Sequence, residues 1–106
     1  MARPEPPTAI LCHNDLCAIG ALKAALARGL QVPGDMSITG FDDIEFAAQI
    51  TPGLTTIRQP ILQIGETAAT LLIRWLEEGT PPPALVRLPV ELVVRESTAA
   101  PQEGRD

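Results

Sequence analysis

The sequence predicts an α/β fold in which a mostly parallel sheet is flanked by helices. Short apolar, β-prone runs alternate with helical patterns in the order β-α-β-α-β-α-β, and such alternation is typical of parallel sheets. Polar clusters directly follow the first two runs, at 13–15 and at 42–43, and sheets of this kind bind ligands at the carboxyl ends of their strands. The 106 residues, 45% of them hydrophobic, are enough for one globular unit and too few for two.

The first half of the chain predicts two strands and the helix between them. Residues 8–12 form a short apolar run that is consistent with a buried strand. Asn14 and Asp15 suit the start of a helix, because their side-chain oxygens accept hydrogen bonds from the free amides of a first turn. The helix carries its apolar residues on one stripe and is predicted to end at Gly29, a natural C-terminal cap. Residues 36–41 alternate and indicate the second strand.

After the second strand, the pattern predicts a short helix, a third strand and a final extended segment. The short helix covers 44–50 and is expected to be capped by Asp43. The third strand covers 54–57, and the last extended segment covers 86–96. Pro89 lies inside that segment, which favours an edge position or a break into two pieces, since proline cannot donate a backbone hydrogen bond.

The longest predicted helix covers 61–78. Pro60 suits its first turn and Gly79 its end, and a run of prolines from 81 prevents its continuation. Six apolar residues recur at helical spacing along it. This apolar stripe consists of Ile61, Ile64, Ala68, Leu71, Leu72 and Trp75.

Composition limits the classes of function. The net charge is -5 and the eight Lys and Arg residues form no run, so we expect that this chain alone does not hold DNA, which normally requires a basic stripe or patch. There is no apolar stretch of about 18 residues, which a membrane helix needs, and no secretory signal. We therefore expect a cytoplasmic protein without membrane contact, with a disordered lead-in over 1–7, a folded portion over 8–98 and a polar tail over 99–106.

The two cysteines, Cys12 and Cys17, do not predict a metal site. A structural zinc site needs four ligands, usually from Cys-x2-Cys pairs, and His13 is the one other soft ligand nearby. We expect no metal and no cofactor, and interpret the cysteines as two buried thiols in a reducing cytoplasm.

Enzymatic motifs are absent from the sequence. A nucleophile elbow would read Gly-x-Ser-x-Gly and a phosphate loop would read Gly-x-x-x-x-Gly-Lys-Ser/Thr, and neither occurs. A phosphoreceiver domain needs a Lys after a later strand, whereas Lys23, the single lysine, lies early in the chain within a helix. We expect no catalytic residue, and a small α/β enzyme stays as a rival hypothesis.

A binding site for a small polar molecule fits the polar clusters better. Asn, Asp and Gln side chains hold sugars because their fixed donors and acceptors match patterns of hydroxyl groups. Asn14, Asp42 and Gln59 stand at suitable places, although helix capping is the structural alternative for both polar clusters. Because capping by Asp43 needs only one carboxylate of its pair, Asp42 would be left for a ligand.

Four segments, in order, resemble motifs of the lactose-repressor (LacI/GalR) family of transcription regulators. Residues 12–22 resemble "ND" followed two residues later by "A-I/L-G-A-L", and residues 29–43 resemble "GL-x-VP-x-D-x-S-V-x-G-F/Y-DD". Residues 51–60 resemble "TPPLTT-I/V-x-QP", and residues 88–98 resemble "LP-x-x-L-V-x-R-x-ST". Each motif alone is weak, but the four together at family spacing are highly specific.

The resemblance implies a partial lobe of the periplasmic-binding-protein-like type I fold, from the C-terminal part of a domain that binds an effector and dimerises. It implies Asn14, Asp42 and Gln59 as contacts of a small-molecule effector, expected to be a sugar. It implies a homodimer or larger assembly and operator DNA as a partner only through an N-terminal helix-turn-helix that this chain lacks. The implied dimer surface consists of Ala18, Ala21, Leu22, Phe46 and Ile50.

In the family, the chain crosses between lobes near Arg58 and Gln59, and the next helix packs on the other lobe. Here that helix is 61–78, and its lobe is not in this sequence. Leaving six apolar side chains in water is costly, so we expect a substitute partner: a second copy, a swapped helix or the chain's own sheet. The rival function within this fold is a fragment of a periplasmic-type sugar-binding protein of an ABC transporter.

Overall fold

The computed structural model describes residues 5–102, which form two compact units. One unit comprises the chain up to Arg58 and from Leu92 onward, and the second comprises Gln59–Glu91. The expectation of a single globular unit is therefore wrong. The second unit is one long helix and an extended return segment, and no residue of that helix is buried.

The first unit is built on short strands. β1 (Ala9–Leu11) pairs in parallel with β2 (Ser37–Thr39). β3 (Thr56–Arg58) pairs with β4 (Glu91–Val93). Two isolated parallel bridges, Thr39 with Thr55 and Asp42 with Arg58, connect β2 to β3. The predicted α/β fold and the element order are confirmed.

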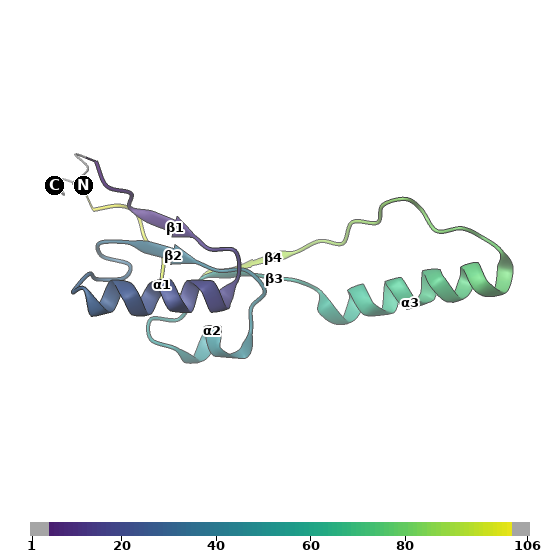
Figure 1. Ribbon diagram of the computed structural model, residues 1–106, viewed down its shortest axis with the longest axis horizontal. Coiled ribbons are helices and arrows are strands. Elements are labelled where there is room, and N and C mark those ends of the chain that lie inside the picture. The colour runs from purple at the N-terminus through teal and green to yellow at the C-terminus, as the bar shows by residue number, and fades with distance from the viewer. Residues whose placement is uncertain (1–4, 103–106) are drawn as a thin grey trace. The chain divides into compact units, whose positions relative to one another are not determined.

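Two helices cover this unit and contribute residues to its core. α1 (Asp15–Ala27) runs alongside β1 and β2, and α2 (Glu45–Gln49) follows β2 (Figure 1). Because Gly29 has a positive φ of 80°, the chain can turn away at the end of α1. The buried apolar core consists of Ala18, Leu22, Ile38, Ala47 and Leu54.

The prediction of a buried first strand is wrong. All three residues of β1 are exposed, and the Leu11 side chain is 81% exposed. β1 pairs with β2 alone among the described residues, so its other edge has no neighbouring strand. An apolar run indicates that a strand can be buried, but not whether the neighbours that bury it are present.

The second unit contains α3 (Ile61–Glu78), whose predicted limits are confirmed. Pro60 precedes the helix as its N-cap, and Gly79 ends it in a left-handed conformation with φ of 71°. The return segment has no regular structure before β4, which begins only after Pro89, so the predicted break at this proline is confirmed. Among the described residues, no helix has the length and apolar character to cross a membrane.

The predicted ends of the chain fall partly outside the described residues, which exclude 1–4 of the lead-in and 103–106 of the tail. Residues 5–7 have no regular structure. Ala99, the first residue of the predicted tail, is held by the sheet: its backbone N–H donates to Ser37 Oγ at 3.0 Å. The ordered chain therefore extends past the predicted boundary at 98.

Candidate functional site

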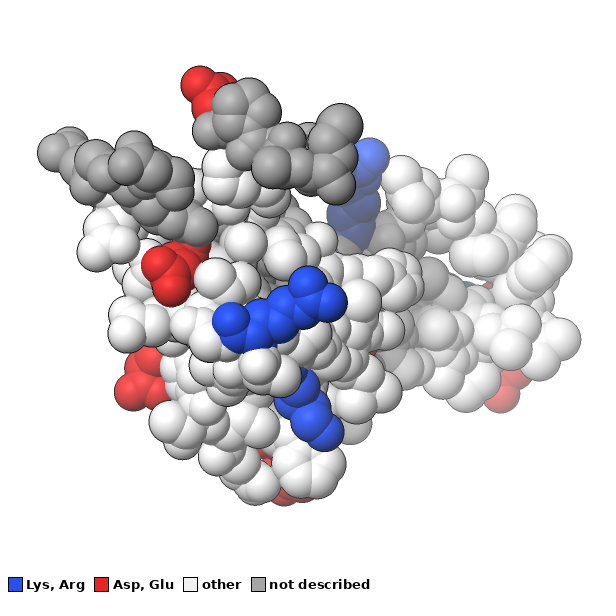
Figure 2. Space-filling model, turned by 60° about the vertical axis from the view of Figure 1, so that its left-hand side comes forward, with Lys and Arg blue, Asp and Glu red and all other residues white. Residues whose placement is uncertain are grey.

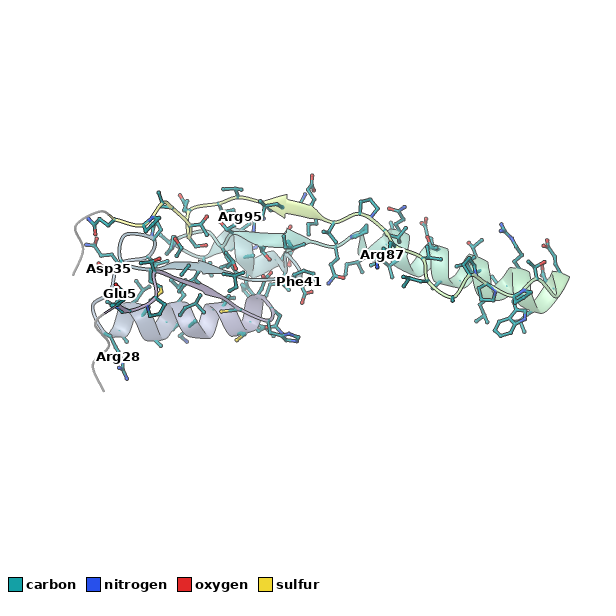
Figure 3. The ribbon with its side chains drawn as sticks, turned by 90° about the horizontal axis from the view of Figure 1, so that it is seen from above. Glu5, Arg28, Asp35, Phe41, Arg87 and Arg95 are labelled. Atoms are coloured by element: carbon teal, nitrogen blue, oxygen red, sulfur yellow. The ribbon has the colours of Figure 1, made fainter. Side chains whose placement is uncertain are left out.

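The carboxyl ends of the first three strands meet at one edge of the sheet. The backbone N–H of Asp15, just after β1, donates to the Phe41 carbonyl at 3.0 Å, and the N–H of Asp42 donates to the Ile57 carbonyl at 2.9 Å. Figure 3 shows Phe41 at this end of the sheet. We call this region the strand-end edge, and it consists of Asn14, Asp15, Phe41, Asp42 and Ile57. Two predicted effector contacts, Asn14 and Asp42, lie on it.

Asn14 is the N-cap of α1. Its backbone is extended, with φ of -154°, and its side-chain oxygen accepts a hydrogen bond from the Cys17 backbone N–H at 2.8 Å. The capping interpretation is therefore confirmed. The cap uses only the side-chain oxygen, so the side-chain NH2 group of this half-buried residue is a donor in addition to the cap.

Asp15 is fully buried and joins three elements, a role that the sequence analysis missed. Its carboxylate accepts hydrogen bonds from Thr56 Oγ1 at 2.6 Å and from the Ile44 backbone N–H at 2.8 Å. Gly40 lies so close that a Cβ there would collide with the Asp15 carboxylate and reach 3.0 Å from Leu54 Cδ2. The glycine of the second motif thus gives the aspartate of the first motif the space that it needs.

Asp43 is an ion-pair partner, and the prediction that it caps the short helix is wrong. Its carboxylate binds Arg58 Nε at 2.7 Å and a terminal nitrogen of Arg95 at 2.8 Å. The N-cap of α2 is Ile44, which makes no side-chain capping bond. Both Asp42 and Asp43 have positive φ, of 120° and 61°, a region that Asp tolerates better than most residues.

The two arginines control the charge state of Asp43. Burial alone would raise the pKa of its carboxyl, but hydrogen bonds from Arg58 and Arg95, together with their positive charges, hold the pKa below the ordinary value. The Asp43 side chain is 9% exposed, against 18% for Arg95 and 51% for Arg58. Asp43 is therefore an ionised acceptor in a largely buried ion pair with Arg95.

A second polar cluster ties the last motif to the centre of the sheet. Ser97 Oγ donates to the Ile38 carbonyl at 2.6 Å and accepts from the Thr55 backbone N–H at 2.9 Å. The hydroxyl groups of Thr55 and Thr98 lie 2.8 Å apart. Among the described residues, every buried side-chain nitrogen or oxygen has a hydrogen-bond partner. Residues from all four motifs therefore hold the fold together.

A hollow of about 260 Å³ opens on the sheet of the first unit, close to the strand-end edge. Its lining is apolar, and neither Asn14 nor Asp42 contributes to it. It is lined by Leu11, Cys12, Thr39, Gly40, Phe41, Thr55, Thr56, Ile57 and Leu92. Within residues 5–102, no group of three or more His, Cys, Asp or Glu side chains is arranged to hold a metal ion.

Gln59, the third predicted effector contact, belongs to the second unit. It lines an apolar hollow of about 330 Å³ between α3 and the return segment. The other lining residues are Pro60, Ile64, Thr67, Ala68, Leu71, Val86, Leu88 and Val90. The structure thus brings Asn14 and Asp42 to one edge and places Gln59 in a separate unit.

The cysteines differ from the prediction of two buried thiols. Cys12 is partly buried and Cys17 is exposed. Burial, followed by the neighbouring Cys17, raises the pKa of the Cys12 thiol. The prediction fails because Cys17 occupies the outward side of the first turn of α1, whereas Ala18 beside it enters the core.

Comparison with known proteins identifies the family. A family model described as "Periplasmic binding protein-like domain" matches residues 1–98. The chain belongs to this family. The match covers all four motifs of this periplasmic binding protein-like chain and both of its units.

The curated relatives of this periplasmic binding protein-like chain are bacterial transcription repressors. It is 42% identical over 97 residues to the probable HTH-type transcriptional repressor ExuR of Bacillus subtilis. It is 43% identical over 97 residues to the HTH-type transcriptional repressor CytR of Escherichia coli. Each match covers 92% of this chain but only 29% and 28% of the respective relative. The LacI/GalR resemblance drawn from the motifs is confirmed.

Solved structures agree with this assignment. A dimeric Lac repressor with an 11-residue C-terminal deletion is 41% identical, with a TM-score of 0.83 over 91% of this chain and 35% of that one. A LacI family regulator from Enterococcus faecium with bound ribose is 37% identical, with a TM-score of 0.80 over 90% and 35% of the two chains. The predicted partial periplasmic-binding-protein-like lobe is therefore confirmed.

Only some of the residues expected to form the dimer surface of this family member are exposed. Ala18 and Leu22 are 0% and 4% exposed, so the prediction is wrong for these two core residues. Ala21 and Ile50 are half-buried against the same core. Phe46, at 60% exposure, is the one member of the set with a large exposed side chain. Periodicity identified the apolar face of α1 but not that this face packs on the chain's own sheet.

The apolar stripe of α3 stays largely in solvent. Ile64, Ala68 and Leu71 line the hollow that the return segment partly covers. Ile61, Leu72 and Trp75 are 63%, 52% and 50% exposed. The return segment therefore covers one side of the stripe, and a partner for the rest stays a prediction.

Proposed function

We propose that this chain is the effector-sensing and dimerising portion of a LacI/GalR-type DNA-binding transcription regulator. The chain spans less than a third of the curated repressors that it matches, so a separate helix-turn-helix would read the operator. The effector would shift an equilibrium between two arrangements of the regulator, one of which binds the operator more tightly.

The observation that carries this proposal is the juxtaposition of Asn14 and Asp42. The hydrogen bond from the Asp15 N–H to the Phe41 carbonyl fixes the residues that precede and follow it at one sheet edge. An amide donor beside a carboxylate acceptor suits neighbouring sugar hydroxyls. Ligands of α/β sheets enter at such strand ends. Two similar structures hold ribose and lactose, and a third is described as a cellobiose complex.

The charge of the chain supports a role in which it influences DNA binding without contacting the DNA itself. The net charge is -5, and Figure 2 shows a mostly uncharged face with a few Lys and Arg side chains and no continuous basic stripe. Operator affinity would therefore come from another domain. Acting on operator DNA implies a place in the cytoplasm, and in this role the chain catalyses no reaction.

The curated relatives are named as transcriptional repressors, which favours a regulator over a transporter-linked binding protein. The regulator would form a homodimer, as the dimeric Lac repressor does by its description. On this chain, Phe46 offers the exposed apolar side chain for that contact.

An NMR titration of the isotope-labelled chain tests the sugar-binding proposal. Ribose, lactose and cellobiose are added in turn while the backbone amide signals are followed. We expect at least one sugar to shift the amides of 12–17 and 40–44 and to leave those of α3 unchanged. If none of the three sugars shifts the strand-end edge up to its solubility limit, the proposal is wrong.

A further inference from the structure

The turn that follows β2 has a backbone conformation that few residues adopt. Asp42 and Asp43 have φ of 120° and 61°, and neither is a glycine. The value at Asp43 lies in the left-handed helical region, which Asp tolerates, whereas the value at Asp42 lies outside it. A backbone of this kind persists only where surrounding contacts enforce it, and it is typical of ligand-binding sites.

Backbone contacts hold the two ends of this turn. Where the chain enters it, the Asp42 N–H donates to the Ile57 carbonyl at 2.9 Å, and Asp42 pairs with Arg58 in an isolated parallel bridge. Where the chain leaves it, the Ile44 N–H donates to the buried Asp15 carboxylate at 2.8 Å. Between these two anchors, the turn is held through the side chain of Asp43.

The Asp43 carboxylate is bound by two arginines, of which Arg95 is itself held in place. One carboxylate oxygen accepts from Arg58 Nε at 2.7 Å, and the other accepts from a terminal nitrogen of Arg95 at 2.8 Å. Arg95, which follows β4 (Figure 3), also donates from its other terminal nitrogen to the Leu54 carbonyl at 2.9 Å. Its backbone N–H donates to Thr55 Oγ1 at 3.0 Å. The Arg58 side chain is 51% exposed, and exposed ion pairs contribute little, so Arg95 is the main partner.

We propose that Asp43 and Arg95 are positioning residues for the effector, because their ion pair keeps Asp42 in the backbone conformation in which it binds a sugar. The effect on affinity rests on the proposed function of Asp42, whereas the effect on the backbone of residue 42 does not. When the binding conformation is only partly populated, the dissociation constant rises by the inverse of its population. A turn that keeps this conformation in about a tenth of the molecules therefore binds about ten-fold more weakly.

The backbone of residue 42 is tested first, in the full chain without sugar. The NMR three-bond coupling between the amide and α protons depends on φ, and relaxation of residue 42 to a negative φ raises it. We expect a higher coupling in Asp43→Asn and in Arg95→Gln than in the wild type. Ser97→Ala is the control: it loses two buried hydrogen bonds elsewhere in the sheet, so it should lower stability and leave this coupling unchanged. A wild-type coupling in both variants of the ion pair would overturn the positioning role.

Sugar affinity then tests whether the ion pair acts through Asp42. With the sugar that the wild-type chain binds, and at a temperature where each variant is fully folded, Asp43→Asn and Arg95→Gln should bind about ten-fold more weakly. Ser97→Ala should bind as the wild type does. Wild-type affinity in both variants of the ion pair would overturn the proposal.

A double variant separates action through Asp42 from any other effect of Asp43. Asp42→Gly removes the side chain and suits a positive φ, so adding Asp43→Asn to it should weaken binding no further. Losses that multiply in the double variant would overturn the proposal. A wild-type chain that binds none of the sugars would instead contradict the proposed function, and the coupling of residue 42 would still decide whether the ion pair holds the turn.

Discussion

The buried carboxylate of Asp15 accepts a hydrogen bond from Thr56 Oγ1 at 2.6 Å across 41 residues of sequence. The same carboxylate accepts the Ile44 backbone N–H. One side chain thus fixes the start of α1, the approach to α2 and the end of the sheet at which a ligand is proposed to bind. Asn14 directly precedes Asp15 in the chain, so this buried contact also sets the position of Asn14.

Replacing Asp15 with Asn should destabilise the first unit. The carboxamide keeps the shape but has one acceptor oxygen and turns an NH2 group toward a backbone N–H or a hydroxyl donor. Hydrogen bonds to charged groups contribute about 1.5–3 kcal/mol, so we expect a loss of about that size in the free energy of unfolding, measured by urea denaturation. Asp35→Asn, which changes an exposed acceptor of the Gln31 N–H, is the control and should cost under about 1 kcal/mol.

Two glycines should respond in opposite directions to replacement by alanine. A Cβ at Gly40 would meet the Asp15 carboxylate and Leu54, whereas a Cβ at Gly20, on α1, meets nothing within 4 Å. We expect Gly40→Ala to lower the free energy of unfolding by about 1–3 kcal/mol through overpacking. Gly20→Ala should raise it by up to about 1 kcal/mol through helix propensity. Thermal unfolding of the two variants checks this, and equal effects would contradict the proposed close approach at Gly40.

Local signals were predicted well from the sequence, and long-range partners were not. Pro60 and Gly79 gave the limits of α3 because each acts on its own backbone. Asp43 was assigned to capping, a local role, but its partner Arg95 lies 52 residues away. A single sequence does not show which distant segment reaches a given carboxylate.

The same reason explains why the candidate site was only partly predicted. Alternation of elements was enough to place Asn14 and Asp42 at one sheet edge. It could not show that Ala18 and Leu22 pack on the chain's own sheet, or that the first strand is exposed. Burial depends on which neighbours are present, and periodicity reports only which face is apolar.

Acid should weaken the fold through Asp43. Its pKa is lowered in the folded chain, so its contribution is complete above the unfolded value of about 3.9 and is lost as the pH falls through the lower, folded pKa. Asp43→Asn should therefore flatten the dependence of the free energy of unfolding on pH below about 4. Arg58→Gln and Arg95→Gln remove one partner each and should move the acid-induced loss to higher pH. A pH dependence equal to the wild type in Asp43→Asn would contradict this account.

The exposed apolar surfaces should make the chain associate. Burying a large aliphatic side chain is worth about 1.5–3 kcal/mol, so we expect a concentration-dependent increase of mass in light scattering on a sizing column. Leu72→Lys, on the apolar stripe, and Phe46→Lys, on α2, should each reduce this association. Leu62→Lys changes an α3 leucine that is also exposed, at 78%, but lies outside the stripe, and it should have little effect. A monomer at all concentrations would contradict both surfaces.

The most direct test of the sensing role is the sugar affinity of cap-preserving variants. Asn14→Ser keeps a capping oxygen but loses the amide donor, and Asp42→Asn removes the charge while tolerating positive φ. With the sugar that shifts the strand-end edge most, we measure dissociation constants by NMR titration and stability by thermal unfolding. The account predicts affinity about ten-fold weaker in each variant, with little change in melting temperature. Wild-type affinity in both variants would contradict the assignment of this edge as the effector site.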